Sequence, residues 1–420
     1  PTNMAAIRCR EFLESVGCGC VRVATVHSAL GIQSTDGEWE FRHNEKNPLH
    51  VRFLIGDEWS MVGTGLFCSF LKAVPKDCGL LMIGDTNQLP PVEYGSPLRD
   101  MIAAGVPAGE LSEIHRNSGS IVRVCSAICD GRPWQPDDCL DLKAANPQNL
   151  LLTPASQAQA QAKVLELLAT IRDQSPFDAV WDTQVLVAVN KKSPLSRVEL
   201  NRKIQEMLNP APCDPKTPFR MGDKVVQVEK EVAPLAEYQK DWKTKQYDWK
   251  PLDERATIYK GEFGRVLLAE EKRTVVRFFN PERTVIVYRG SKNGDGKDGD
   301  SADDDAESRT GCNMDLGYAV TVHRAQGSQW PLMIYCIDQY PGASGPHGVV
   351  DKAHVYTGIS RAQKACFLVG MKHVADRACS RSFIRRRKTF LAELLKEYAN
   401  AAGVALADTR TPVPQITDLW

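Results

Sequence analysis

Two short apolar runs, each followed by acidic residues, constrain the fold of this chain most. The run at 51–55 (Val-Arg-Phe-Leu-Ile) leads into Gly-Asp-Glu at 56–58, and the run at 80–83 (Leu-Leu-Met-Ile) leads into Gly-Asp at 84–85. Apolar runs of this length are too brief for a helix and are typical of buried central strands in a parallel sheet. Ligands of open α/β sheets bind at the carboxyl edge of the strands. The sequence therefore predicts a parallel sheet that delivers carboxylates to a ligand site.

The acids at this edge suit nucleotide chemistry. A hard cation such as Mg²⁺ takes carboxylate oxygen and keeps several waters, so Asp57 could hold the ion while Glu58 polarises the attacking water. Gln88, after the second strand, is an uncharged group able to orient that water or to sense a γ-phosphate. An Asp-Glu pair alone often only caps a strand. The Gly-Asp-x-x-Gln-Leu-Pro-Pro run at 84–91 favours the catalytic interpretation.

Length and charge narrow the class of protein. A chain of 420 residues is long enough for two or three domains. Its formal net charge is zero with 25% charged residues, so any nucleic-acid site must be local rather than a global basic field. No apolar run approaches the roughly 18 residues of a membrane span, and no signal-peptide pattern occurs. We expect a cytoplasmic protein without a membrane partner.

The 13 cysteines show no metal-binding pattern. No Cys-x-x-Cys pair occurs, and the Cys18-x-Cys20 and Cys125-x₃-Cys129 pairs lack partners at zinc spacing. Buried, reduced thiols of a cytoplasmic protein are the expected state.

The N-terminal third predicts an α/β pattern with one insertion. Thr2 can cap a helix that closes at Gly17. A strand is predicted at 21–26, and a small hairpin within 32–50. The further predicted helices span 96–105, with a first-turn proline and a terminal glycine, and 120–130.

A second α/β pattern, interrupted by an all-β segment, follows. A helix is predicted at 156–172, a strand at 184–189 and a helix from Ser193. Short strands without intervening helices, typical of a small β-barrel, are predicted at 224–228, 263–268, 275–279 and 285–288. An acidic, flexible loop is predicted at 290–310. Helix–strand alternation then resumes at 318–325, 332–337, 355–362 and 365–369, before a terminal helix at about 383–400.

With these residues in view, the chain resembles a superfamily 1 helicase of the RecD-like, 5′-to-3′ branch. The motifs that carry the resemblance are Pro1–Ala6 (motif Ia), Ala24–His27 (Ic), Gly56–Met61 (II), Gly84–Val92 (III), Leu111–Asn117 (IV), Tyr318–Ser328 (V) and Tyr356–Ala362 (VI). Two further runs, Gly222–Val225 and Tyr259–Gly264, are similar to the start of the inserted barrel of this family. Motifs III, V and VI in this order are highly specific.

The resemblance implies an α/β fold of two RecA-like parallel-sheet domains with an inserted, Src-homology-3-like β-barrel. The first domain would span 1–117, with the hairpin insertion at about 32–50. The second would combine 118–220 with 311–420, and the barrel with its acidic loop would span 221–310.

The resemblance also implies a site for ATP and Mg²⁺. Asp57 would hold the metal ion, Glu58 would act as general base, and Gln88 would contact the γ-phosphate. Arg116 and Arg361 would stabilise charge on the transferred phosphoryl group. For Arg116 a surface salt bridge is the alternative.

Nucleic acid would be gripped mainly through its phosphates. By resemblance, the contacts would come from Thr2, Thr25, His27, Thr321, His323 and Gln326. Gln326 and Gly327 lie where motif V links the ATP cleft to the nucleic-acid track. Gly327 would help to line the ATP cleft. Both histidines could instead be structural.

One aromatic run and one basic run each allow two interpretations. Trp39 and Phe41 could form a strand-separating pin or pack on their own domain. The run 385–388 is either a solvated helix face or a DNA contact.

The pattern departs from the family at two places. The phosphate-binding loop Gly-x-x-x-x-Gly-Lys-Ser/Thr is missing, and the nearest string, at 294–298, lies in the acidic loop. We expect a chain cut just upstream of Pro1, so that this piece alone hydrolyses ATP weakly or not at all. Gln329 stands where many relatives carry an acid.

The predicted function is an ATP-dependent 5′-to-3′ helicase or translocase on single-stranded DNA or single/double-strand junctions. It would be the motor of a DNA repair, recombination or replication protein, working with a nuclease, a relaxase or a single-strand-binding protein. One alternative is a catalytically silent nucleic-acid-binding module, although binding alone needs none of Asp57, Glu58, Gln88 and Arg361. Another is the motor segment of a relaxase or nuclease complex. The sequence does not separate DNA from RNA.

Overall fold

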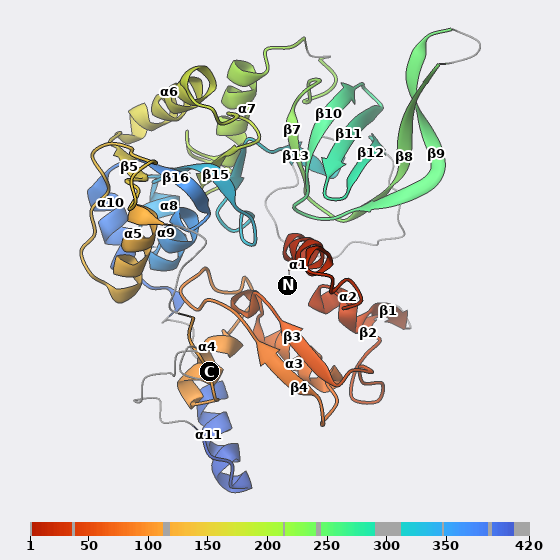
Figure 1. Cartoon of the computed structure of the whole chain (residues 1–420), viewed down its shortest axis with the longest axis vertical. Helices are drawn as coiled ribbons and strands as arrows, with labels where there is room; N and C mark the ends of the chain where they lie inside the picture. The colour runs from red at the N-terminus through yellow and green to blue at the C-terminus, as the bar shows by residue number, and fades with distance from the viewer. Residues whose placement is uncertain are drawn as a thin grey trace. The chain divides into compact units, whose positions relative to one another are not determined.

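The computed structural model describes residues 2–35, 38–111, 118–212, 215–240, 245–289, 312–346, 348–384 and 389–406, without the side chains of 33–35, 38 and 39. By its internal contacts the chain divides into two compact units. The first unit comprises residues 1–156 and 325–420, and the second comprises residues 157–324. Figure 1 shows the elements of each unit.

Two helices open the first unit. α1 (Asn3–Ser15) is capped by the Thr2 hydroxyl, which accepts from the Ala5 amide at 3.1 Å, so the predicted helix is confirmed. The predicted strand at 21–26 is wrong, because residues 21–25 have no regular structure and α2 (Val26–Leu30) begins there. The cause is local. The Thr25 hydroxyl accepts from the Ser28 amide at 3.2 Å, the N-cap bond that starts a helix.

The predicted hairpin is present. β1 (Ile32–Thr35) pairs antiparallel with β2 (Glu38–Phe41). Phe41 is partly buried and packs against the core of the first unit, which matches the packed alternative to a strand-separating pin. The side chain of Trp39 lies outside the described residues.

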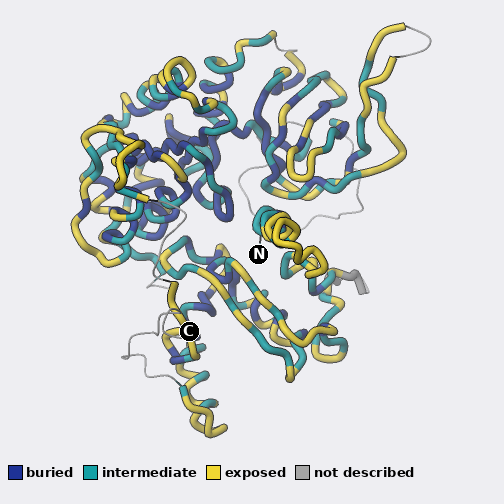
Figure 2. Tube along the Cα trace, in the orientation of Figure 1, coloured by how far each residue is buried: buried dark blue, intermediate teal, exposed yellow. Residues whose placement is uncertain are grey.

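The first acidic strand is not buried as predicted. β3 (Phe53–Gly56) and β4 (Gly79–Met82) pair in parallel, and Gly56 lies opposite Met82. Phe53 and Ile55 are 60% and 64% exposed, and Leu81, which lies opposite Ile55, is also exposed. Figure 2 shows the burial class along the whole trace. Because side chains alternate along a strand, only the other face of this pair packs on the core. The prediction of a central strand covered on both faces is therefore wrong for the described residues.

The covered face of β3 and β4 packs on an aromatic core. Trp59 of the 3₁₀ turn η1 (Trp59–Met61) makes edge contacts with Phe67 and Phe70 of α3 (Thr64–Ala73) at 5.9 and 4.9 Å between ring centroids. The predicted helix after motif III is confirmed as α4 (Pro97–Ala104), with Gly105 in the left-handed conformation at its end. α11 (Leu391–Ala402) packs against α4.

A second set of parallel strands completes the first unit. β16 (Ala362–Val369) pairs in parallel with both β15 (Trp330–Cys336) and β5 (Leu150–Thr153). β15 and β16 are almost wholly buried apolar strands, as expected for strands covered on both faces. The accompanying helices are α5 (Gly119–Asp130), α8 (Pro341–Ser344), α9 (Lys352–Ile359) and α10 (Lys372–Cys379).

The second unit joins an α/β part to an antiparallel sheet. β6 (Thr183–Val187) pairs in parallel with β14 (Ala319–Thr321), accompanied by α6 (Gln157–Gln174) and α7 (Arg197–Leu208). The α/β class with parallel strands is thus confirmed. The predicted helix from Ser193 begins instead at Arg197, and its cap residue Ser196 lies three residues after Ser193.

Among the described residues, seven strands form the antiparallel sheet, in the order β13-β7-β10-β11-β12-β8-β9. They are β7 (Lys224–Gln227), β8 (Glu231–Lys240), β9 (Tyr247–Ile258), β10 (Phe263–Ala269), β11 (Arg273–Phe279), β12 (Glu282–Tyr288) and β13 (Met314–Leu316). Four of them were predicted. β8, β9 and β13 were not.

The expectation of buried thiols holds for only some of the cysteines. In the described part of the chain the cysteines are free thiols, of which three are buried and five are exposed, so buried thiols are only part of the pattern. No helix among the described residues is long and apolar enough to span a bilayer.

Candidate functional site

The acidic pair stands at the carboxyl end of β3. Asp57 is exposed, and its Oδ1 accepts from the Glu58 amide at 2.8 Å. Glu58 adopts a left-handed backbone with φ of 56°. Such a conformation is uncommon outside glycine and clusters at functional sites. The strand end thus presents two carboxylates from a constrained turn.

The segment after β4 is pressed against the turn after β3. The Ile83 amide donates to the Gly56 carbonyl at 2.7 Å, and the Trp59 amide donates to the Ile83 carbonyl at 2.9 Å. A Cβ on Gly84 would lie 2.8 Å from the Ser60 amide nitrogen, closer than real contacts allow. Motifs II and III are therefore packed backbone to backbone.

Asp85 is the hub of a polar network. Its Oδ2 accepts from the Tyr356 hydroxyl at 2.7 Å and from Gln88 Nε2 at 3.4 Å, and its Oδ1 accepts from the Asn87 amide at 2.9 Å. Burial raises the pKa of Tyr356, and the neighbouring Asp85 carboxylate raises it further. The phenol therefore keeps its proton and acts as the donor.

Both backbone polar groups of Leu89 form hydrogen bonds with side chains. Its amide donates to the Thr357 hydroxyl at 2.9 Å, and its carbonyl accepts from Gln326 Nε2 at 3.3 Å. Leu89 itself is only 3% exposed. Motif III is thus bonded to both motif V and motif VI.

Arg361 lies beside this network. Its guanidinium is buried, and it donates to the Thr357 carbonyl and to the Ser360 hydroxyl, each at 3.2 Å. Thr357 therefore touches Leu89 through its hydroxyl and Arg361 through its carbonyl. Burial raises the pKa of the Cys125 thiol, which the Arg361 guanidinium acts to lower and the Asp85 carboxylate acts to raise.

Gln88 has an unsatisfied acceptor. Its Oε1 is buried and has no hydrogen-bond partner in the described part of the chain, whereas its Nε2 bonds Asp85. Buried polar atoms are nearly always paired. An orphaned acceptor next to the strand ends is therefore a group available to a ligand or a water.

Comparison with known proteins finds similarity to helicases. Residues 1–144 match the family model of an AAA domain, and residues 316–369 match that of a UvrD-like helicase C-terminal domain. The chain is 29% identical over 412 residues to the ATP-dependent RecD2 DNA helicase of Deinococcus radiodurans, an alignment that covers 95% of this chain and 46% of that protein. The chain is thus similar to the RecD-like helicases of superfamily 1. The resemblance seen in the motifs is thereby confirmed.

Two further proteins show similarity to this chain. The RecD-like chain is 23% identical over 409 residues to the RecBCD enzyme subunit RecD of Mycobacterium tuberculosis, covering 92% of this chain and 62% of that protein. A solved Pif1 helicase from Bacteroides, in complex with ADP-AlF3 and ssDNA, aligns with 16% identity and a TM-score of 0.42, over 90% of this chain and 84% of that one. The RecD-like chain spans about half the length of the relatives that it matches.

In the RecD-like chain, motif Ia meets motif V. Thr2 Oγ1 lies 3.0 Å from where a Cβ on Gly327 would stand, and Gly327 has a left-handed φ of 75°. Arg8 of α1 donates to the Gly327 carbonyl at 2.7 Å. Three of the predicted nucleic-acid or nucleotide contacts, Thr2, Gln326 and Gly327, are thus adjacent in one unit.

The other predicted nucleic-acid residues are placed separately. Thr25 caps α2, and the exposed His27 on that helix has its ring 6.0 Å from that of Phe41. Thr321 and His323 belong to the second unit, where the Thr321 hydroxyl accepts from the Arg324 amide at 3.3 Å.

Some predictions lie outside the described residues, and some site residues were missed. Arg116 and the basic run 385–388 are not among the described residues. Asp85 and Tyr356 were not singled out, although Asp85 follows β4 as Asp57 follows β3, and that parallel was the available signal.

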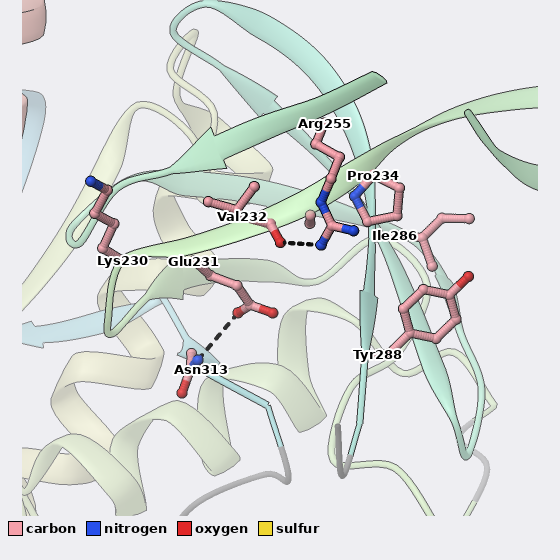
Figure 3. Close-up of a pocket in the computed structure, with 9 residues that line it drawn as sticks. Lys230, Glu231, Val232, Pro234, Arg255, Ile286, Tyr288 and Asn313 are labelled. Atoms are coloured by element: carbon pink, nitrogen blue, oxygen red, sulfur yellow. Dashed lines mark hydrogen bonds between the residues drawn. The ribbon is translucent and has the colours of Figure 1, made fainter. Parts of the chain in front are cut away.

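The second unit has a surface pocket of its own. It is lined from β8, β9 and β12, with polar groups from Glu231, Arg255 and Asn313 (Figure 3). Arg255 donates to the Val232 carbonyl at 2.9 Å, and Asn313 donates to Glu231 at 3.3 Å. None of the predicted site residues lines it.

Proposed function

We propose that this chain is the motor part of an ATP-dependent DNA helicase that moves 5′ to 3′ along single-stranded DNA. The observation that carries the proposal is the bonding of motif III to motif VI, through Asp85 to Tyr356 and through Leu89 to Thr357. A motor needs the γ-phosphate sensor to be mechanically linked to the element that supplies the arginine. A module that only binds nucleic acid needs no such linkage.

The proposed architecture is two RecA-like domains, spanning 1–117 and 118–220 with 311–420. The strands β7 to β12, which lie within 221–310, would form the inserted Src-homology-3-like barrel, and β13 extends their sheet beyond that range. The insertion of these strands between helix α7 and strand β14 supports this division.

Asp57 is the proposed ligand of a nucleotide-bound Mg²⁺. Mg²⁺ takes one or two carboxylates from a protein and fills its remaining positions with water and phosphate oxygens. An exposed carboxylate at a strand end, with one oxygen turned to the backbone, fits that demand. When bound, the ion would neutralise charge that develops on the phosphates.

Glu58 and Gln88 are the proposed water-handling groups. Glu58, which directly follows Asp57 in a left-handed backbone conformation, would accept a proton from the attacking water. The orphaned Oε1 of Gln88 would accept a hydrogen bond from that water. The Nε2 of Gln88 already bonds Asp85, so a change at the γ-phosphate would reach Tyr356 through one carboxylate.

Arg361 and Arg116 are the proposed charge stabilisers. An arginine that meets the transferred phosphoryl group is worth about 10³–10⁵ in rate. The Arg361 guanidinium is buried and bonded at its own helix end, so its engagement would be coupled to Thr357 and hence to motif III. Arg116 is proposed on its motif alone.

DNA would be held through phosphate contacts that carry no sequence information, as a translocase requires. Thr2 and Gln326 would provide them beside the left-handed Gly327, with Thr25, His27, Thr321 and His323 extending the track. Single-stranded DNA and single/double-strand junctions are the proposed substrates.

The decisive experiment measures ATP hydrolysis with and without single-stranded DNA, followed by strand displacement on duplexes with a 5′ or a 3′ tail. Because the 420 residues contain no Gly-x-x-x-x-Gly-Lys-Ser/Thr run, the chain alone is expected to turn over slowly. The assay therefore includes an N-terminally extended protein that carries such a loop.

The expected result is DNA-stimulated hydrolysis by the extended protein, a loss of at least about 10²-fold in Glu58→Gln, and displacement only from the 5′-tailed substrate. Glu93→Gln, an exposed acid after motif III, is the matched control and should retain activity. DNA binding without any hydrolysis would instead favour the silent binding module. Displacement from the 3′ tail would overturn the polarity.

A further inference from the structure

The β8–β9 hairpin of the second unit carries a strip of aromatic rings. Tyr238 lies opposite Trp249, and Lys240 lies opposite Tyr247. Opposite residues share a face of a strand pair, and so do alternate residues along each strand. These four side chains therefore line one face, which we name the aromatic face. Figure 1 shows that the hairpin continues past the shorter strands of its sheet.

The rings of the aromatic face contact one another yet stay accessible. Tyr238 stacks on Tyr247 with ring centroids 5.5 Å apart and an interplanar angle of 25°, and it packs against Trp249 at 5.1 Å. Tyr238 and Tyr247 are 55% and 60% exposed. Their rings thus form an ordered surface that leaves much of its area open to solvent.

Each face of the hairpin carries a lysine, Lys240 or Lys250, but the nearby acids lie on only one face. Lys240 places its Nζ 5.9 Å from the Tyr247 ring centroid, on the aromatic face. The two nearby acids alternate onto the opposite face, where Asp248 bonds Arg273 at 2.9 Å and Glu237 accepts from Gln239. The aromatic face therefore has a cation and, within 236–240 and 247–251, no carboxylate.

The hairpin is anchored to the body of the sheet. Arg273 of β11 donates to the Trp249 carbonyl and to the Asp248 carboxylate, both at 2.9 Å. The anchor uses the Trp249 backbone and the Asp248 side chain, which lies on the opposite face, so it occupies no side chain of the aromatic face. The rings are thus held in place before any partner arrives, which lowers the entropy cost of binding.

We propose that the aromatic face binds the bases of single-stranded nucleic acid by stacking, with Lys240 near a phosphate. The proposal rests on the proposed function and adds a second, base-contacting surface to the phosphate-contacting track. Every base has a π-face, so stacking on tyrosine and tryptophan tolerates any sequence, as a translocase requires. The absence of a carboxylate on this face of the described hairpin favours a polyanion over an acidic or neutral protein partner.

The test is equilibrium binding by fluorescence anisotropy, with the 420-residue chain and two labelled strands of equal length. One strand is oligo-dT, and the other has the same phosphate backbone without bases. The wild-type chain should bind oligo-dT more tightly than the abasic strand. Tyr247→Leu keeps apolar bulk but removes the ring, so it should weaken oligo-dT binding by about 5- to 100-fold and leave abasic binding unchanged.

Three companion variants separate stacking from other effects. Tyr247→Phe keeps the ring and should keep wild-type affinity. Gln239→Ala, on the opposite face of the same strand, is the matched control and should also bind as wild type. Lys240→Ala should weaken both strands and lower the slope of log affinity against log salt by about 0.7.

The outcomes distinguish the two proposals. If the wild-type chain binds neither strand, the proposed function and the hairpin surface both fail. Suppose that the wild-type chain binds oligo-dT, and that the variants Tyr247→Leu and Tyr238→Leu bind it as tightly as the wild type. The hairpin surface alone is then overturned. A loss that appears equally on abasic and base-containing strands would also overturn stacking, because that pattern reports a damaged fold or a backbone contact.

Discussion

The amide of Leu89 donates a 2.9 Å hydrogen bond to the hydroxyl of Thr357, although 268 residues separate them in sequence. The bond is buried, and the Thr357 carbonyl in turn accepts from Arg361. A single threonine therefore links the segment that carries Gln88 to the arginine proposed to meet the phosphoryl group. Displacement of either end changes the hydrogen bonding of the other.

Replacing Thr357 by valine should uncouple these segments. Valine keeps the shape but leaves the Leu89 amide buried without its acceptor, which costs about 1–3 kcal/mol in the free energy of unfolding. Urea denaturation measures this loss, and the hydrolysis rate of the extended protein should fall as well. Thr357→Ser retains the hydroxyl and should restore most of both. Equal stability of the valine and serine variants would show that the bond contributes little.

Gly84 should tolerate no side chain. A Cβ there would stand 2.7 Å from Leu98 Cδ2 and 2.8 Å from the Ser60 amide nitrogen. Gly84→Ala should destabilise the first unit by about 1–3 kcal/mol, as overpacking does, and push motif III away from motif II. The control is Gly65→Ala in α3, where the nearest atom is Glu93 Oε2 at 3.8 Å. That variant should be neutral or stabilising by up to about 1 kcal/mol in urea denaturation.

The uncovered face of β3 and β4 predicts unusual tolerance at apolar positions. Ile55 is 64% exposed whereas Phe67 is 4% exposed. Ile55→Thr should change the free energy of unfolding by less than about 0.5 kcal/mol, while Phe67→Ala should cost about 3–5 kcal/mol. Thermal and urea denaturation of both variants make the comparison. A cost above about 1.5 kcal/mol for Ile55→Thr would mean that this face is covered in solution.

Local sequence signals, such as helix-capping residues, predicted part of the fold. The Thr2 cap and the Pro97 and Gly105 pair act within one helical turn, so the sequence predicts α1 and α4 close to their observed bounds. The same reasoning failed for residues 21–25, where an apolar stretch has no strand partner among the described residues and the Thr25 cap begins a helix instead.

The hairpin β8–β9 was missed for a physical reason. Its strands contain Pro234 and Pro251 and many charged residues, which lower the strand signal. Most of its pairing is between the two strands themselves, so it needs few core residues. The alternation of aromatic and lysine residues at 238–250 was the available signal for its role.

The candidate site was likewise predicted only in part. Asp57 and Gln88 were found because strand ends can be recognised from sequence. The bond from Tyr356 to Asp85 spans 271 residues, and no spacing rule places those two side chains together. Only the folded chain reveals that a phenol from motif VI and a carboxylate from motif III form one network.

Lys224 predicts a pH dependence of stability. Its ammonium is buried, and desolvation lowers its pKa to about 7, although Asp178 and Asp182 act to raise it. Between about pH 7 and the unfolded pKa of about 10.5, the unfolded chain holds a proton that the folded chain has released. The free energy of unfolding should therefore rise with pH in this window, by at most about 1.4 kcal/mol per pH unit from this group.

The measurement compares wild type with Lys224→Met by urea denaturation at pH 7.5 and 9.5. Methionine cannot titrate, so the wild type should gain stability relative to the variant as the pH rises. Lys216→Met, at an exposed ion pair with Glu271, is the control and should track the wild type. The Lys224 Nζ also donates to the Val180 carbonyl at 2.6 Å and to the Thr183 carbonyl at 3.2 Å. A difference that does not change with pH would mean that these carbonyls keep the ammonium charged, so that its burial is offset by hydrogen bonding rather than by loss of the proton.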